Sequence, residues 1–310
     1  MINLRPLQNF IKVVELGSLS RAAQALHIAQ PALSTQIAAL EEDLEVKLLD
    51  RTHRGVRPTE AGIILCRHAR ALIHHMHETR ELIKAGRRSA SGTVSVGVPM
   101  SLLEVFAIPL IKRLRERYPD IHPHIQAHSS FYLRELVING RLDMAVTLQG
   151  EEHKGLKSKL IATEELYFVA LAGKPRAANK APISLPEVAK YPLVLSAIPY
   201  TGRMILQEAA ARAGVKLNVV AEINTSWALL ATVEAGLGAT MMAMSAIPRH
   251  SPIHCFDFRS FSPSIKHQIS LCISDELPLT AAARLTVRTI PPLIAELAAA
   301  GQWPALRLSL

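Results

Sequence analysis

The sequence predicts an α/β protein in three consecutive parts: a small helical domain with a short hairpin, one long helix, and a two-lobed α/β domain. Three observations lead to this fold class. Apolar residues in the first 60 positions recur at helical spacings of three and four. Within residues 61–88, apolar residues then recur at alternating spacings of four and three. From residue 92 onward, short apolar runs alternate with amphipathic segments, which is typical of strands alternating with helices.

Residues 1–60 predict three helices. The first covers residues 3–16 and completes a small core. The second begins at a cap, Ser18 or Ser20, and the small alanines on its inner face let another helix cross it closely. The third has Gln30 as its N-cap and Pro31 at the first helical position, where the missing N–H costs nothing. Its buried stripe is formed by Leu33, Ile37, Leu40 and Leu44. Two short helices joined by a tight turn are a helix-turn-helix unit, whose second helix presents its N-terminal side chains to base edges in the major groove.

Polar and small side chains surround the start of that third helix. Gln, Ser and Thr can hydrogen-bond to base edges or to phosphates. The candidate DNA contacts are Ser20, Gln30, Pro31, Ala32, Ser34, Thr35 and Gln36. We expect Gln30, Ser34 and Gln36 to form the hydrogen bonds.

Residues 48–59 predict a small basic hairpin. Gly55 permits a tight turn, and Arg51, Arg54 and Arg57 place cations around it. The hairpin is therefore interpreted as a wing that holds the phosphate backbone or enters the minor groove. The alternative is an amphipathic three-helix segment followed by an ordinary solvated loop.

The long helix is predicted to begin at the cap residue Thr59 and to reach about Arg88. Its apolar seam is formed by Leu65, Ala69, Leu72, Met76, Thr79 and Ile83. A helix so long and so thinly apolar needs a partner, and the simplest partner is the same helix of a second copy. The alternative is that the helix folds back on its own chain. Several histidines lie on this helix, but no cysteine or carboxylate set completes a metal site, so no metal is expected.

The third part, residues 92–300, predicts two α/β lobes. Residues 93–98, 121–127 and 142–148 read as near-continuous apolar strands separated by helices, which indicates a parallel sheet. We assign about 92–161 and 268–300 to lobe I, and about 162–267 to lobe II. Two such lobes joined by two crossovers look like a periplasmic-binding-protein fold, whose cleft closes around a ligand by hinge motion.

Hydroxyl side chains lie where ligands bind in such sheets, at the carboxyl ends of strands and at helix starts. The candidate effector-binding residues are Ser101, Ser129, Thr147 and Thr201. Hydroxyls and helix N-termini suit a carboxylate or another small anion. Each residue could equally be a helix cap that contacts no ligand.

The pattern LxxFxxVxExGSLSxAAxxLHIAQPALSxQIxxLExxLxxxLLxRxxRGVxPTEAG, which covers residues 7–62, closely resembles the LysR-type transcriptional regulators. The HIAQPALS and RGVxPTEAG segments look most like the branch that contains nitrogen-assimilation-control regulators. The resemblance covers essentially the whole chain. It implies a winged helix-turn-helix at residues 1–60, a linker helix at 61–88 that pairs two DNA-binding domains, and an effector-binding domain with its pocket between the lobes. Ser101 best fits the family's polar position after the first strand of this domain. The neighbouring Met100 stands where many relatives have a small or polar residue, so the resemblance does not define the chemistry of the ligand.

Charge and composition exclude fewer classes of function than the motifs do. The chain has a net charge of +9, yet residues 1–60 contain seven basic and seven acidic residues. Most of the acids lie in residues 41–45, and the wing arginines cluster apart from them. DNA binding would therefore depend on the local electrostatic potential around these arginines and not on the overall charge. The scattered Cys66, Cys255 and Cys272 have neither disulfide nor zinc spacing. With no membrane-length apolar run and no leader pattern, we expect a cytoplasmic location.

Three function classes remain. The first is a sequence-specific transcription regulator of double-stranded DNA, a homodimer through the linker helix and a homotetramer overall, which contacts RNA polymerase and needs no cofactor. Closure of the lobes would change the placement of the dimers and so the bending of DNA. The second is an α/β enzyme, although GxSxG, P-loop, HExxH and CxxC patterns are absent from the sequence. The third is an architectural DNA-binding protein or a regulator that needs no effector.

Overall fold

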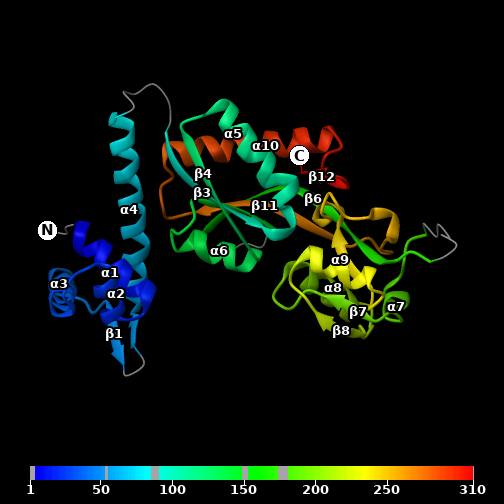
Figure 1. Cartoon of the computed structure of the whole chain (residues 1–310), viewed down its shortest axis with the longest axis horizontal. Coiled ribbons are helices and arrows are strands. Elements are labelled where there is room, and N and C mark those ends of the chain that lie inside the picture. Colours follow the sequence, from blue (N-terminus) through cyan, green and yellow to red (C-terminus); the bar gives the residue numbers. More distant parts are fainter. Residues whose placement is uncertain (1–3, 53–54, 85–90, 149–152, 174–180, 310) are drawn as a thin grey trace.

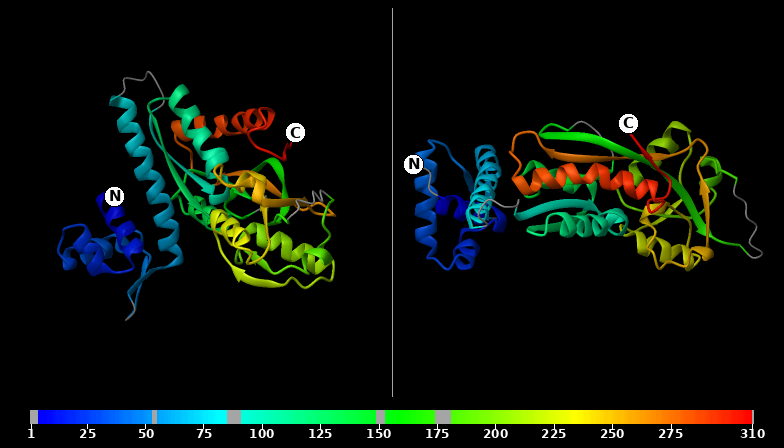
Figure 2. Two further views of the ribbon diagram at one scale, coloured as in Figure 1. Left: turned by 45° about the vertical axis from the view of Figure 1, so that its right-hand side comes forward. Right: turned by 90° about the horizontal axis from the view of Figure 1, so that it is seen from above.

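The computed structural model describes residues 4–52, 55–84, 91–148, 153–173 and 181–309. Figure 1 shows the three parts in chain order: a small N-terminal domain, the long helix α4, and a larger α/β domain. The view from above in Figure 2 shows these parts arranged in a row, with the C-terminus far from the N-terminal domain. The mixed α/β fold class is therefore confirmed.

The N-terminal domain is a three-helix unit with a two-stranded hairpin. Its elements are α1 (Leu4–Leu16), α2 (Leu19–Ala25), α3 (Gln30–Asp43), β1 (Leu49–Thr52) and β2 (Gly55–Pro58). Phe10, Leu33 and Ile37 are fully buried between the helices. Ser18, one of the two caps considered, accepts a hydrogen bond from the backbone N–H of Arg21 and begins α2. The spacing of apolar residues thus gives the expected core.

The start of α3 differs by one residue from the expectation. Ala29, in an extended conformation, is the N-cap, and its carbonyl accepts the backbone N–H of Leu33 at 3.1 Å. Gln30 is consequently the first helical residue and not the cap. An N-cap is defined by its backbone conformation, so a side chain suited to capping does not by itself fix the position.

Helix α4 (Glu60–Lys84) follows the hairpin directly. Thr59 caps it by accepting the N–H of Gly62 at 3.1 Å. The first part of α4 packs against the N-terminal core through the buried Cys66 and Ala69. The expected helix continues beyond Lys84, but residues 85–88 lie outside the described residues.

The large domain begins with a parallel αβ unit. Its strands are β3 (Gly92–Pro99), β4 (Ile121–His128) and β5 (Met144–Leu148), with β3 parallel to both others. Its helices are α5 (Ile108–Arg117), α6 (Ser130–Ile138) and the late α10 (Ala281–Ala299). Between β3 and α5 lie two short helical turns, η1 (Met100–Leu102) and η2 (Leu103–Ala107). The first three strands thus run parallel, as predicted.

Two long antiparallel strands connect this unit to a second one. They are β6 (Leu156–Leu171) and β11 (Lys266–Ser274). The sheet order is β10-β6-β11-β5-β3-β4, so the sheet is mixed and not wholly parallel. The direction of a strand depends on its pairing partners, which its apolar pattern does not disclose.

The second unit is built around the far end of β6. Its elements are α7 (Leu185–Val188), β7 (Leu193–Leu195), α8 (Thr201–Arg212), β8 (Val219–Glu222), α9 (Ser226–Glu234), β9 (Thr240–Ala243), η3 (Met244–Ala246), η4 (Ile253–Cys255) and β10 (Phe256–Ser260). Strand β6 pairs with β11 up to Glu165 and with β9 from Leu166 onward. Strands β10 and β12 (Leu306–Leu308) were not predicted from the sequence. Each unit has its own core, with Phe106 and Trp303 in the first and Phe168 and Leu206 in the second.

Candidate DNA-binding face and effector cleft

The first turns of α3 present most of the predicted DNA contacts to solvent. Gln30, Pro31, Ala32 and Thr35 are exposed, and Ser34 is partly exposed. Thr35 donates its hydroxyl to the carbonyl of Pro31 at 3.0 Å, which holds that side chain against its own helix. Ser20 is exposed on the neighbouring helix α2.

Gln36 is placed differently from its neighbours on α3. Its Oε1 accepts a hydrogen bond from Nδ2 of Asn9 at 2.5 Å, and Asn9 is itself buried. This bond ties α3 to α1 and leaves the Nε2 donors of Gln36 for other partners. Sequence reasoning missed this pair, because Asn9 lies on the apolar face of the first helix.

The basic hairpin lies beside the start of α3. Nη1 of Arg51 on β1 donates to Oγ of Ser34 on α3 at 3.2 Å, so a wing arginine and a candidate base contact are neighbours. Arg57 is exposed on β2, opposite Asp50 in the strand pairing. Arg54 lies outside the described residues.

Backbone contacts fix the position of the wing. The N–H of Val56 donates to the carbonyl of Gly17 at 3.0 Å. Gly55 has φ +122°, and a Cβ added there would lie 2.6 Å from the same carbonyl. Position 55 therefore requires glycine for two reasons: the carbonyl of Gly17 lies too close for a side chain, and the backbone has a positive φ.

Glu41 anchors the base of the wing, a role that sequence reasoning missed. Its carboxylate is buried at the end of α3, where Oε1 accepts the N–H groups of Leu48 at 2.7 Å and Leu49 at 3.1 Å. Burial acts to raise the pKa of Glu41, but these two amides and the nearby Lys47 outweigh it and hold that pKa below its ordinary value. In the sequence, Glu41 is one of several acids in a row, and nothing distinguishes it from the exposed Glu42.

A cavity of about 110 Å³ lies between the two α/β units. Three of the four predicted effector residues line it: Ser101 and Ser129 from the first unit and Thr201 from the second. Oγ of Ser129 accepts the N–H of Tyr132 at 3.4 Å, as a helix cap does. Thr201 donates to the carbonyl of Leu148 at 3.0 Å, a bond that connects α8 to the end of β5. Met100 also lines the cavity and is 43% exposed, so a thioether borders the hydroxyls.

Thr147 does not line this cavity. It is fully buried, and its Oγ1 lies 3.2 Å from Sγ of Cys272. Side chains alternate between the faces of a strand, and Thr147 shares its face with Ala145, which packs under α6. Thr147 therefore points away from the cleft although it stands near the carboxyl end of its strand.

A buried histidine–glutamate pair adjoins the cleft and was not predicted. Nε2 of His267 lies 3.0 Å from Oε2 of Glu164, and the two residues are 4% and 1% exposed. Oε1 of Glu164 also accepts the N–H of Ser245 at 3.2 Å. Because His267 lines the cavity, the pair connects the cleft to both long strands. An acidic residue inside the apolar run LIATEELYF was the one signal that could have indicated it.

Neither a metal cluster nor a membrane-spanning helix is found in the described part of the chain. Among these residues, no three His, Cys, Asp or Glu side chains are placed to hold a metal ion together. The side chains of His74 and His77 lie outside that description. Within the same residues, no helix combines the length and the apolar character needed to span a bilayer.

A winged helix-turn-helix joined by a long helix to a two-lobed α/β domain is the architecture of a DNA-binding regulator with an effector-binding domain. Residues 4–63 match the bacterial regulatory helix-turn-helix proteins of the lysR family, and residues 87–297 match the LysR substrate binding domain. The chain belongs to this family and is a LysR-type DNA-binding transcriptional regulator with an effector-binding domain.

Relatives and solved structures agree with this assignment. The chain is 35% identical to the nitrogen assimilation regulatory protein nac of Klebsiella aerogenes over 79% of each chain, and 34% identical to that of Escherichia coli K12 over the same shares. The fold is similar to that of a full-length OxyR variant from Pseudomonas aeruginosa, with TM-score 0.71, 21% identity and 95% coverage of both chains. It is also similar to full-length CbnR complexed with its target DNA, with TM-score 0.63, 22% identity and coverage of 94% of this chain and 100% of that one.

Proposed function

We propose that the chain is a sequence-specific regulator whose arrangement on DNA is controlled by a small anion bound between the lobes. The observation that carries this proposal is the contact between Arg51 and Ser34, which places a wing cation beside the exposed start of α3. A helix start can read base edges while the adjacent wing cations bind phosphates. The residues proposed to contact DNA are Ser20, Gln30, Pro31, Ala32, Ser34, Thr35, Gln36, Arg51, Arg54 and Arg57.

For the effector we propose Ser101, Ser129 and Thr201 as contacts. The cavity of about 110 Å³ is much smaller than the roughly 300–1,000 Å³ typical of drug-sized ligand pockets. Its hydroxyl lining and the start of α8 suit an anion of a few non-hydrogen atoms. Because the ligand would contact both lobes, it favours their closed arrangement over the open one.

For the assembly we propose a homodimer through α4 and a homotetramer built from two dimers. Leu72, Met76 and Ile83 of the predicted seam are 55%, 51% and 75% exposed in the single chain. A second α4 would cover these side chains and place two α3 helices for two half-sites. Leu72→Asp should therefore convert the dimer to monomers in sedimentation, whereas Arg115→Ala on the exposed face of α5 should not.

For the domain boundaries we propose 1–60, 61–88 and 92–300, with lobe I at 92–161 and 268–300 and lobe II at 162–267. Strand β6 pairs with β11 up to Glu165 and with β9 after it, which supports a boundary between the lobes in this part of β6. For this chain we further propose a cytoplasmic location, contact with RNA polymerase and no catalytic activity.

The direct experiment is a footprint of the purified protein on DNA upstream of its own and neighbouring genes, at several salt concentrations. Protection of more than one half-site supports sequence-specific binding by a tetramer. Diffuse and strongly salt-dependent binding alone would instead indicate an architectural protein or a missing effector.

Substitutions separate the two kinds of DNA contact. Gln36→Ala should alter the preference among sites, and unchanged affinity for every site would contradict its base-reading role. Arg54→Ala should weaken specific and nonspecific binding alike and flatten the salt dependence. A change in sequence preference alone would contradict the wing assignment.

A further inference from the structure

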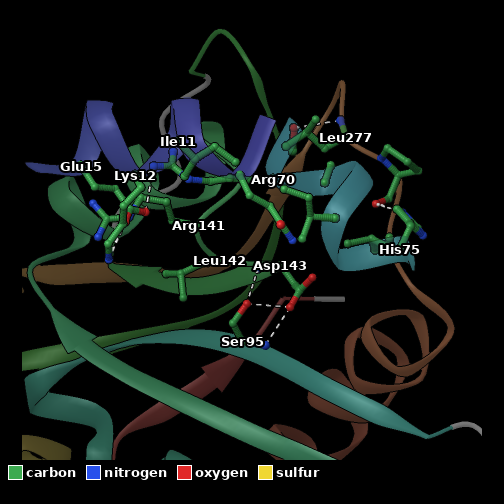
Figure 3. A pocket seen from close by; sticks show the side chains of 17 residues that line it. Ile11, Lys12, Glu15, Arg70, His75, Ser95, Arg141, Leu142, Asp143 and Leu277 are labelled. Carbon is green, nitrogen blue, oxygen red and sulfur yellow. Dashed lines mark hydrogen bonds and ion pairs between the residues drawn. The ribbon is translucent and has the colours of Figure 1, made fainter. Parts of the chain in front are cut away.

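A second and larger cavity, of about 520 Å³, lies where the N-terminal domain meets the effector domain. Its walls come from α1, from the middle of α4, and from the loops before β5 and after β11. Figure 3 shows the labelled side chains that line it, which come from all these elements. It shares no lining residue with the inter-lobe cleft. This junction cavity is therefore a separate feature of the fold.

Direct contacts hold the two sides of the junction cavity together. Arg67 of α4 forms an ion pair with Glu276, which follows β11. Nη1 of Arg70 donates to the carbonyl of Asn139 at 3.4 Å, and Nε2 of His75 lies 3.1 Å from the carbonyl of Pro278. The junction is thus a packed interface that encloses a space.

The charges that line the cavity do not balance. Glu15 interacts with both Lys12, at 3.8 Å, and Arg70, at 3.4 Å. Asp143 accepts the N–H and the hydroxyl of Ser95, at 2.7 and 2.6 Å. Both carboxylates therefore already have donors.

Arg141 is the third cation of the lining, beside Lys12 and Arg70, against the two carboxylates Glu15 and Asp143. It lies in the loop before β5 and is exposed, and its guanidinium has no hydrogen-bond or ion-pair partner in the part of the chain that the structure describes. A guanidinium binds a carboxylate through two parallel hydrogen bonds. The lining thus carries one more cation than carboxylates, and the guanidinium of Arg141 is placed to take an anion.

The rest of the lining is largely apolar. Ile11 of α1, Ile73 of α4 and Leu142, Leu277 and Leu279 of the effector domain border the same space. The volume lies within the roughly 300–1,000 Å³ range of small-molecule sites. One unmatched guanidinium beside aliphatic walls fits a ligand with a carboxylate head and an apolar body.

We propose that the junction cavity is a second ligand site, which takes an amphipathic organic acid with its carboxylate on Arg141. Such a ligand contacts α1 and α4 on one side and the effector domain on the other, so it stabilises the docked arrangement of the two parts. The seam residues Leu72 and Met76 are not part of the lining, so pairing of two α4 helices leaves the site available. Ligand binding at this cavity does not depend on the proposed function. Only an effect of the ligand on DNA binding rests on that proposal.

The test uses the full-length protein with hexanoate as the probe, hexanol as the uncharged probe, and titration calorimetry with saturation-transfer NMR as the readouts. The wild type should bind hexanoate in preference to hexanol. Arg141→Ala should weaken hexanoate binding roughly two- to fivefold, because an ion pair with an exposed guanidinium is lost. Arg115→Ala, which removes an exposed arginine elsewhere in the same lobe, should bind like the wild type.

Two further variants separate the junction cavity from the inter-lobe cleft. Ala71→Phe fills the cavity from α4 and should abolish hexanoate binding, with the DNA footprint as the check that the protein is folded. Thr201→Val alters the cleft and should leave hexanoate binding unchanged. No binding by the wild type, equal binding by Arg141→Ala, or loss of binding with Thr201→Val alone would overturn the proposal. Absence of a footprint with the wild type would instead count against the proposed function.

Discussion

Two buried glutamates, one in each functional region, are stabilised in different ways. Glu41 beneath the wing accepts backbone N–H groups from Leu48 and Leu49, seven and eight residues along the chain. Glu164 beside the cleft faces His267 and the N–H of Ser245, 103 and 81 residues away. The wing is thus fixed by local contacts within one small domain, whereas the cleft depends on contacts between distant strands. We expect the wing to keep its shape when other parts move, and the cleft to respond to movements of the lobes.

The largest effect should follow removal of the carboxylate in the cleft. Glu164→Ala leaves His267 and the Ser245 amide without their buried partner and should lower the free energy of unfolding of the effector domain by about 3 kcal/mol. Both tryptophans, Trp227 and Trp303, lie in that domain, so urea unfolding followed by fluorescence reports on it alone.

Glu165→Ala is the matched control, because Glu165 is the next residue of β6 and its ion-pair partners, Lys266 and Arg307, are both exposed. It should change the same free energy by less than about 1 kcal/mol. Equal effects of the two substitutions would remove the distinction that we draw for Glu164.

A smaller effect is expected under the wing. Glu41→Gln keeps the shape of the side chain but removes its charge, and it should destabilise the wing by about 1–2 kcal/mol. Hydrogen exchange at the amides of Leu48 and Leu49 should accelerate roughly tenfold, since 1.4 kcal/mol is a factor of ten. The adjacent and exposed Glu42→Gln should leave these amides as protected as in the wild type.

The charge of Glu41 also makes the stability of the wing depend on pH. Because the folded protein lowers the pKa of Glu41, its contribution is fully present above the pKa of an unfolded glutamate, about 4.3. The contribution is lost as the pH falls from there through the lowered folded value. The difference in amide protection between wild type and Glu41→Gln should therefore disappear in acid, and a difference that grew on acidification would contradict the assigned direction.

The smallest change, in the free energy of DNA binding, is expected at the proposed DNA-binding face of the protein. Arg51→Ala would remove one proposed phosphate contact and should weaken DNA binding several-fold, with the salt slope reduced by about one unit. Ser34→Ala loses its bond to Arg51 but keeps the cation, so its salt slope should match that of the wild type. Filter binding at several salt concentrations measures both slopes.

The sequence predicted the N-terminal domain better than the cleft. The stripe of Leu33 and Ile37 and the wing at Gly55 depend on local periodicity and turn chemistry, which a single sequence contains. Thr147 was predicted to line the cleft, but the face on which it lies depends on the register of β5. The pairing of Gln36 with Asn9 likewise follows from how α1 crosses α3.

By itself, the sequence determined the order of the three parts, the helix-turn-helix and its exposed face, and the family to which they belong. These features arise from residues close together in the chain, so spacing alone defines them. Only the tertiary structure decided which hydroxyls meet at the cleft, that Glu164 and His267 form a buried pair, and that Arg141 borders a cavity at the domain junction. These features require segments far apart in sequence to be brought together, and that arrangement is set by the packing of whole elements rather than by any local pattern.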